Sequence, residues 1–148
     1  MKIVTALVCA TLFAAEGKTY FTQQEALQEI WGESELTSEQ YSEHTFYMSH
    51  DSADDSSACF ISKRVRSKGQ SLMLHVAADG TIIDLVVCHF GEPVRYKAPP
   101  RFYQQFVGKK LNDDLRLKRD IDGISGATLT SRATVASVRE ILEAHAEK

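Results

Sequence analysis

Residues 71–90 read SLMLHVAADGTIIDLVVCHF, two apolar runs joined by a short segment that contains Asp79 and Gly80. Apolar and β-branched residues on both sides of an Asp-Gly pair predict a β-hairpin, in which Asp79 and Gly80 supply the positive φ angles of a type I′ turn. We expect one face of this hairpin to lie in the core. Its cross-strand pairs, counted outward from the turn, are Val76 with Ile83, Leu74 with Leu85 and Leu72 with Val87.

The opposite face of the hairpin carries a more polar set of side chains. The same register places His75 opposite Asp84, and Ser71 opposite Cys88. A His-Asp pair is two thirds of a hydrolase triad, but the sequence places no serine or cysteine nucleophile beside it. An ordinary cross-strand charge pair is therefore the favoured interpretation.

Helical periodicity predicts three main helices around the hairpin. Thr22 is a suitable N-cap for residues 23–31, and Pro99 and Pro100 suit the first turn of a middle helix that ends at Gly108. A final helix is expected from Ser131, with one apolar side. The residues of that side are Val135, Val138, Ile141, Leu142 and His145.

The expected fold class is α+β, a small antiparallel sheet built around the hairpin and packed with N-terminal, middle and C-terminal helices. A further short helix is expected after Thr37 or Ser38. With 148 residues, 43% of them hydrophobic, and a net charge of -3, the chain fits one globular domain and gives no electrostatic footprint for nucleic acid. A basic cluster is interpreted as a solvated loop or strand edge: Lys63, Arg64, Arg66 and Lys68.

The N-terminus has the layout of a secretory signal. A single charge at Lys2 precedes an apolar run from Ile3 to Ala15, which is too short to cross a bilayer, and polar sequence follows. We expect a signal peptide over residues 1–17, a single domain over 18–148, and a periplasmic or otherwise exported protein. Membrane association is expected if the signal is not cleaved, and a buried N-terminal strand is the competing interpretation.

Two cysteines, Cys59 and Cys88, remain once Cys9 is removed with the signal. An even pair in an exported protein is compatible with a disulfide. Two buried, unpaired thiols explain the sequence equally well, and the spacing does not match a zinc site.

Residues 122–131, DGISGATLTS, form the loop that enters the final helix. A helix N-terminus offers unpaired N–H groups and a partial positive charge, and phosphate is their natural ligand. Gly123 and Gly126 would let a ligand approach the backbone closely. The glycine spacing excludes a P-loop or a Rossmann fingerprint. The residues alone leave two alternatives, a hydroxyl-rich phosphate site or an elaborate helix cap, built from Ser125, Thr128, Thr130 and Ser131.

The run from Asp122 to Thr128 matches the pattern D-x-x-[S/T]-G-A-T and resembles the FMN-binding domain. That domain occurs in periplasmic subunits of the sodium-pumping NADH:quinone reductase and of the Rnf complex, and in small exported flavoproteins. The resemblance covers roughly residues 70–142, including Glu92-Pro93 and the segment FYQQFVGK. The larger subunits carry a longer Glu-Thr-Pro-Gly segment near the flavin, where this chain has HFGEPVRY, so the ring contacts stay open.

The resemblance implies that a flavin transferase joins FMN, taken from FAD, to Thr128 through a phosphoester bond, with Asp122 read during attachment. It further implies an electron carrier without a substrate of its own, whose partners are proteins such as a membrane reductase or a haem protein. A non-covalent FMN or phosphate-binding module, or an exported structural domain without cofactor, is the alternative. The residues expected at the cofactor are Glu92, Asp122, Ser125, Gly126, Ala127, Thr128, Leu129 and Thr130.

Overall fold

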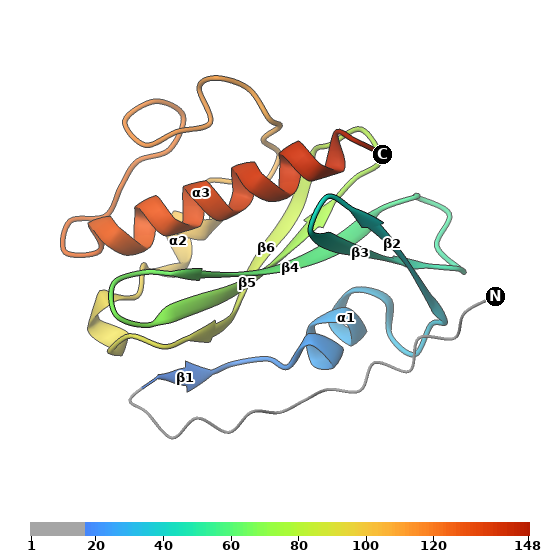
Figure 1. Cartoon of the computed structure of the whole chain (residues 1–148), viewed down its shortest axis with the longest axis horizontal. Coiled ribbons are helices and arrows are strands. Elements are labelled where there is room, and N and C mark those ends of the chain that lie inside the picture. Colours follow the sequence, from blue (N-terminus) through green and yellow to red (C-terminus); the bar gives the residue numbers. More distant parts are fainter. Residues whose placement is uncertain (1–16) are drawn as a thin grey trace.

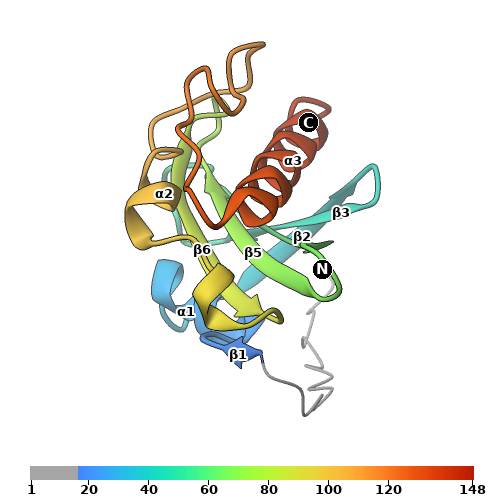
Figure 2. The same cartoon turned by 90° about the vertical axis from the view of Figure 1, so that its left-hand side faces the viewer.

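The computed structural model describes residues 17–148, which form one antiparallel sheet with helices on its two faces (Figure 1). The sheet has six strands in the order β1-β6-β5-β4-β3-β2, and α3 crosses one face while α1 lies on the other (Figure 2). The α+β prediction is confirmed. The elements are β1 Lys18–Thr19, α1 Gln23–Trp31, β2 Leu36–Tyr41, β3 His44–Ser49, β4 Ser57–Arg64, β5 Gly69–Val76, β6 Ile82–Phe90, η1 Val94–Tyr96, α2 Pro100–Gln104 and α3 Thr128–His145.

The expected signal peptide lies outside the described residues except for Gly17. Between residues 17 and 148, no helix has the length and apolar character needed to cross a bilayer.

The β5–β6 hairpin is confirmed, but its turn and part of its register differ from the prediction. Gly80 has a φ of 86°, whereas Asp79 does not adopt a positive φ. Gly80 N donates to Ala77 O, and Ala77 N donates to Thr81 O, so the loop is a type I turn followed by a glycine bulge rather than a type I′ turn. One extra residue in the loop displaces the pairing nearest the turn.

Register shifts mark both ends of the hairpin. Leu74 pairs with Leu85 and Leu72 with Val87, as expected, but Val76 faces Ile82 and Ser71 faces His89. The backbone of Ile82 also exchanges hydrogen bonds with Gly108 and Lys109, which holds this residue at the start of the strand. Ile82 is therefore buried, and Ile83, the predicted partner of Val76, is 39% exposed.

Helix α1 begins as predicted. The Thr22 hydroxyl accepts from Glu25 N at 3.2 Å, and the Glu25 carboxylate accepts from Thr22 N at 2.7 Å, which is a complete capping box. Ala26 and Leu27 bury their side chains in a cluster on the α1 face of the sheet. Both faces of the central strands are covered for this reason.

The short helix expected after Thr37 or Ser38 is wrong. These residues lie in β2, which pairs along its whole length with β3. The burial of LTSEQY alternates over its first residues, as in a strand with one covered face. The turn to β3 places Ser42 at a φ of 55°.

Cys59 and Cys88 are free thiols, so the disulfide alternative is wrong. Cys59 belongs to the core under α3, whereas Cys88 belongs to the cluster under α1, so the sheet lies between them. Burial raises the pKa of each thiol to about 12, which keeps both protonated at neutral pH.

Helix α3 begins three residues before the predicted start, at Thr128. Its buried side contains all five predicted residues, from Val135 to His145. The middle helix α2 starts at Pro100 as predicted, and its Phe102 is buried, but it ends at Gln104 rather than at Gly108 because residues 105–108 form turns. The two helices bracket residues 105–127, and this arrangement brings the glycine-rich loop to one end of the sheet.

Candidate functional site

The loop that leads into α3 is held by its backbone. The Gln105 side-chain amide donates to Asp122 O at 2.9 Å, and Asp122 N donates to Gln105 Oε1 at 2.8 Å. The Asp122 carboxylate accepts no hydrogen bond from any residue between 17 and 148 and is exposed. The anchoring of this loop therefore uses the peptide groups of Asp122 and leaves its charge accessible.

Position 126 favours glycine because of its backbone conformation, not because a side chain would collide with a neighbour. Its φ is 81°, and a Cβ at this position would meet no atom within 4 Å. An L-residue here would be strained although there is room for it. Gly123 has no positive φ, and a Cβ there would make only an ordinary contact with Leu117, so a backbone requirement for glycine exists at Gly126 and not at Gly123.

The hydroxyl-rich loop does not cap α3. The N-cap residue is Ala127, and no side chain caps the helix. The Ser131 hydroxyl donates to Ala127 O at 2.9 Å, and the Thr130 hydroxyl donates to Tyr96 O at 2.6 Å. Both hydroxyls donate to backbone carbonyl groups, and neither accepts from an amide of the first helical turn. The elaborate-cap alternative is wrong for this reason.

The amides of Thr128, Leu129 and Thr130 find no acceptor in the described part of the chain. They point along the axis at the positive end of an 18-residue helix. The side chains of Ser125 and Thr128 are exposed and make no hydrogen bond with residues 17–148. This combination of free amides and a free hydroxyl is what a phosphate group needs.

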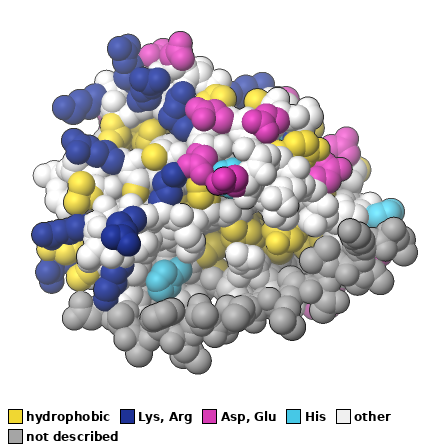
Figure 3. Space-filling model, in the orientation of Figure 1, with side chains coloured by type: hydrophobic (Ala, Val, Ile, Leu, Met, Phe, Trp, Pro, Cys, Tyr) yellow, Lys and Arg dark blue, Asp and Glu magenta, His cyan; other side chains and the backbone are white. Residues whose placement is uncertain are grey.

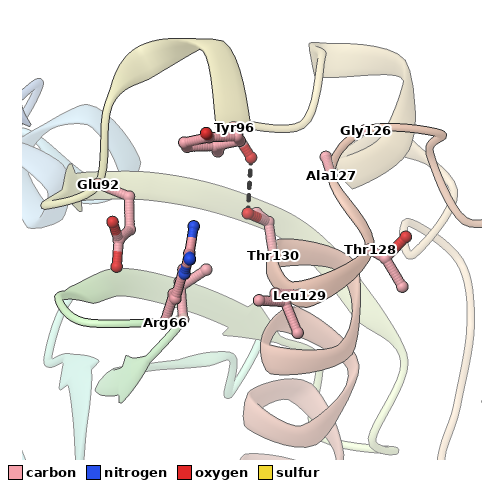
Figure 4. A pocket seen from close by; sticks show the side chains of 9 residues that line it. Arg66, Glu92, Tyr96, Gly126, Ala127, Thr128, Leu129 and Thr130 are labelled. Carbon is pink, nitrogen blue, oxygen red and sulfur yellow. Dashed lines mark hydrogen bonds between the residues drawn. The ribbon is translucent and has the colours of Figure 1, made fainter.

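A cavity of about 240 Å³ opens beside the first turn of α3. Its walls come from the β4–β5 loop, from the segment between β6 and η1, and from the helix start (Figure 4). The Thr128 side chain points away from Arg66 and Glu92 (Figure 4). The lining residues are Val65, Arg66, Glu92, Tyr96, Gly126, Ala127, Thr128, Leu129 and Thr130.

Glu92 lines the cavity, yet its carboxylate already accepts hydrogen bonds from the β4–β5 loop. It is only 4% exposed, and its Oε1 accepts from Ser67 N at 2.6 Å and Lys68 N at 2.7 Å. The Lys68 amide, followed by the Ser67 amide and hydroxyl, holds the pKa of Glu92 below its usual range against the opposing effect of burial. Glu92 thus ties the β4–β5 loop to the end of β6, and its contact with a cofactor stays a prediction.

Buried polar contacts fix the start of α3 against the sheet. The Gln70 side-chain amide donates to the Thr134 hydroxyl at 2.8 Å, and that hydroxyl donates to Thr130 O at 2.9 Å. Gln70 and Thr134 are fully buried, so neither group can turn to water instead. The orientation of the first helical turn, including Thr130, is set by this chain of bonds.

Of the predicted site residues, six line the cavity, and Asp122 and Ser125 lie in the loop before it. Sequence reasoning missed Val65, Arg66 and Tyr96. Arg66 belongs to a basic run that was interpreted as solvated. Tyr96 comes shortly after Glu92, and its carbonyl is bound by Thr130. No spacing pattern links either residue to the glycine-rich loop.

The predicted pairing of His75 with Asp84 is confirmed on the α1 face. The structure adds a serine, because His75 Nε2 lies 2.9 Å from Ser56 Oγ. However, Ser56 is 1% exposed and its hydroxyl donates to Asp54, while Asp84 accepts from Leu85 N. Burial lowers the pKa of His75. Ser56 is too buried to serve as a nucleophile. His75 and Asp84 face each other across the strands but form no ion pair among residues 17–148, so the expected charge pair is wrong.

The family model that describes the FMN-binding domain matches residues 69–143, just over half of the chain. The match begins at β5 and includes the β6–η1 segment, the glycine-rich loop and nearly all of α3. It contains all eight predicted site residues but not Val65 or Arg66. A search of curated proteins finds no relative.

Proposed function

The chain belongs to the FMN-binding domain family, and on that premise we propose that it is an exported electron-transfer flavoprotein with FMN linked to Thr128 by a phosphoester bond. One observation carries the proposal. Thr128 is the first residue of α3, its hydroxyl is exposed and unbonded among residues 17–148, and free amides of the same helical turn lie next to it.

The residues present fit FMN. A phosphate on Thr128 Oγ1 would lie at the positive end of α3, where the unpaired amides and the helix dipole favour a dianion. The adjacent cavity has apolar walls from Val65 and Leu129 and the aromatic ring of Tyr96. Such a slot suits a flat ring system. Leu129 is 45% exposed, an apolar surface that a bound ring would cover.

Attachment would proceed by phosphoryl transfer. Thr128 Oγ1 forms a bond to the FMN phosphorus of FAD while the bond to the AMP phosphate breaks, AMP leaves, and the hydroxyl proton passes to a base of the flavin transferase. The positive φ at Gly126 turns the loop so that the hydroxyl projects outward. The free carboxylate of Asp122, six residues before the acceptor, is available for recognition by that enzyme.

FMN, when attached, supplies one- or two-electron chemistry, and the protein positions the ring and sets its reduction potential. The domain would then carry electrons without a substrate of its own. Its proposed partners are a membrane reductase or a haem protein on the exported side of the membrane. Export itself rests on the N-terminal apolar run, from Ile3 to Ala15.

The test is the intact mass of the protein produced with a flavin transferase in an exporting host. We expect an increase of one FMN less one water in the wild type and none in Thr128→Ala. Thr130→Ala is the matched control, because it removes a neighbouring hydroxyl that is already bonded to Tyr96 O, and it should retain the added mass. Flavin that is released by denaturation would instead support the non-covalent alternative.

A further inference from the structure

Arg66 enters the cavity from outside the matched family domain. It lies in the loop between β4 and β5, three residues before the matched range begins. Its side chain stands between Glu92 and Thr130, with its guanidinium directed toward Tyr96 (Figure 4). The residue is exposed, so its guanidinium is free to turn toward a group bound in the cavity.

The charge of Arg66 is not used within the described structure. No carboxylate of residues 17–148 lies within ion-pairing distance of its guanidinium. Glu92 lies beside it and is ionised, because the same hydrogen bonds hold its pKa below the usual range, but its Oε1 is bound by the amides of Ser67 and Lys68 rather than by the guanidinium. The guanidinium therefore has no ion-pair partner among residues 17–148 and is available to a group bound in the cavity.

The position of this charge relative to Thr128 indicates which part of FMN it meets. The Thr128 hydroxyl points away from Arg66, so a phosphate there would lie on the other side of the helix start (Figure 4). Between the two lies the apolar wall of the cavity, which contains Leu129 and Ala127. A ring that covers this wall would bring one polar edge to the guanidinium.

We propose that Arg66 contacts the ring of FMN attached to Thr128, stabilises its reduced anionic form and so raises its reduction potential. This inference rests on the proposed function. Two electrons from a donor protein or from dithionite, together with one proton from the solvent, convert the neutral ring to a form with one negative charge. A nearby guanidinium favours that form over the oxidised one.

Other cations are near enough to require a control. Lysine and arginine side chains gather at the end of the molecule where α3 begins (Figure 3). The β4–β5 hairpin alone contributes Arg64 and Lys68 besides Arg66. Arg64 is exposed, ends β4 and does not line the cavity. It therefore serves as a matched position for the same change of charge.

The experiment measures the two-electron potential of flavin-loaded wild type, Arg66→Gln, Arg66→Lys and Arg64→Gln. We expect Arg66→Gln to retain FMN by mass and to weaken reduction about tenfold, which is about 30 mV for a two-electron couple. Arg66→Lys should stay near the wild type, and Arg64→Gln should shift the potential much less. Arg66→Gln should also raise the pKa of the reduced ring, seen in the pH dependence of the potential.

Each other outcome would overturn the inference in a recognisable way. Equal shifts in the two glutamine variants would mean that only the general positive field matters, and no shift in Arg66→Gln would remove the contact. Loss of FMN from Arg66→Gln alone would place the residue in attachment instead. Absence of FMN from the wild type would overturn the proposed function and this inference together.

Discussion

The N-termini of α1 and α3 differ in how they use their hydroxyl groups. Helix α1 has one hydroxyl at its start, and Thr22 and Glu25 cap each other's backbone amides. Helix α3 is preceded by a loop rich in hydroxyls, yet no side chain caps it. In α1 the polar side chains satisfy the first backbone amides and stabilise the helix, whereas in α3 the first amides stay unpaired and can bind a ligand.

The largest effect is expected from Asp122→Asn, because it removes a charge that the fold does not use. The backbone of Asp122 is held by Gln105, and its carboxylate has no described partner. We expect the denaturant midpoint to stay nearly unchanged while FMN loading, measured by intact mass, falls at least about tenfold. Normal loading beside a large loss of stability would assign Asp122 a structural role.

Replacement of Gly126 should damage the approach to α3 itself. Gly126→Ala forces an L-residue to a φ of 81°, at a cost of about 1–2 kcal/mol in the free energy of unfolding. Gly123→Ala is the matched control, since that position has no positive φ, and it should change stability by less than about 0.5 kcal/mol. Urea unfolding measures both, and equal costs would contradict the conformational role of Gly126.

The contrast between the two helix starts is sharpened by a pair of threonine variants without cofactor. Thr22→Ala breaks the capping box and should cost about 1 kcal/mol. Thr128→Ala removes no described hydrogen bond and should lie within about 0.5 kcal/mol of the wild type. A similar cost in both variants, measured by urea unfolding, would show that Thr128 serves the fold after all.

The smallest effect concerns the other end of α3. His145 is buried, its Nε2 has no described partner, and burial, then the nearby charge of Lys148, lowers its pKa. A histidine that is neutral in the folded state stabilises fully above its unfolded pKa of about 6.5 and loses that contribution as the pH falls through the lower folded value. In His145→Gln the denaturant midpoint of unfolding should decline less as the pH falls below 6.5. An unchanged decline would show that His145 does not contribute to the pH dependence of stability.

Local signals explain which parts of the fold could be predicted. The capping box at Thr22, the paired prolines and the apolar side of α3 each specify an element within a few residues, and these predictions are confirmed. The predicted hairpin register was wrong near the turn, because Ile82 is held there by hydrogen bonds to Gly108 and Lys109, which are distant in the sequence. Strand β2 was missed because its pairing with β3, not its composition, makes it a strand.

In the candidate site, too, residues that are contiguous in the sequence could be predicted, whereas residues brought together by tertiary packing could not. The glycine-rich loop is contiguous, so its residues were identified together, and six predicted residues line one cavity. Arg66 reaches that cavity only because the β4–β5 hairpin folds over the start of α3 (Figure 1). No property of its neighbours in the sequence distinguishes it from Arg64. A residue that tertiary packing brings to the site cannot be predicted from its spacing in the sequence.

The most direct test of the account is the position of FMN within one tryptic peptide. Cleavage after Arg119 and Arg132 releases residues 120–132, which contain four hydroxyl side chains. Fragmentation of the flavin-loaded peptide should place FMN on Thr128. FMN on Ser125, Thr130 or Ser131, or an unmodified peptide from a preparation made with a flavin transferase, would contradict the claim that α3 carries the cofactor at its first residue.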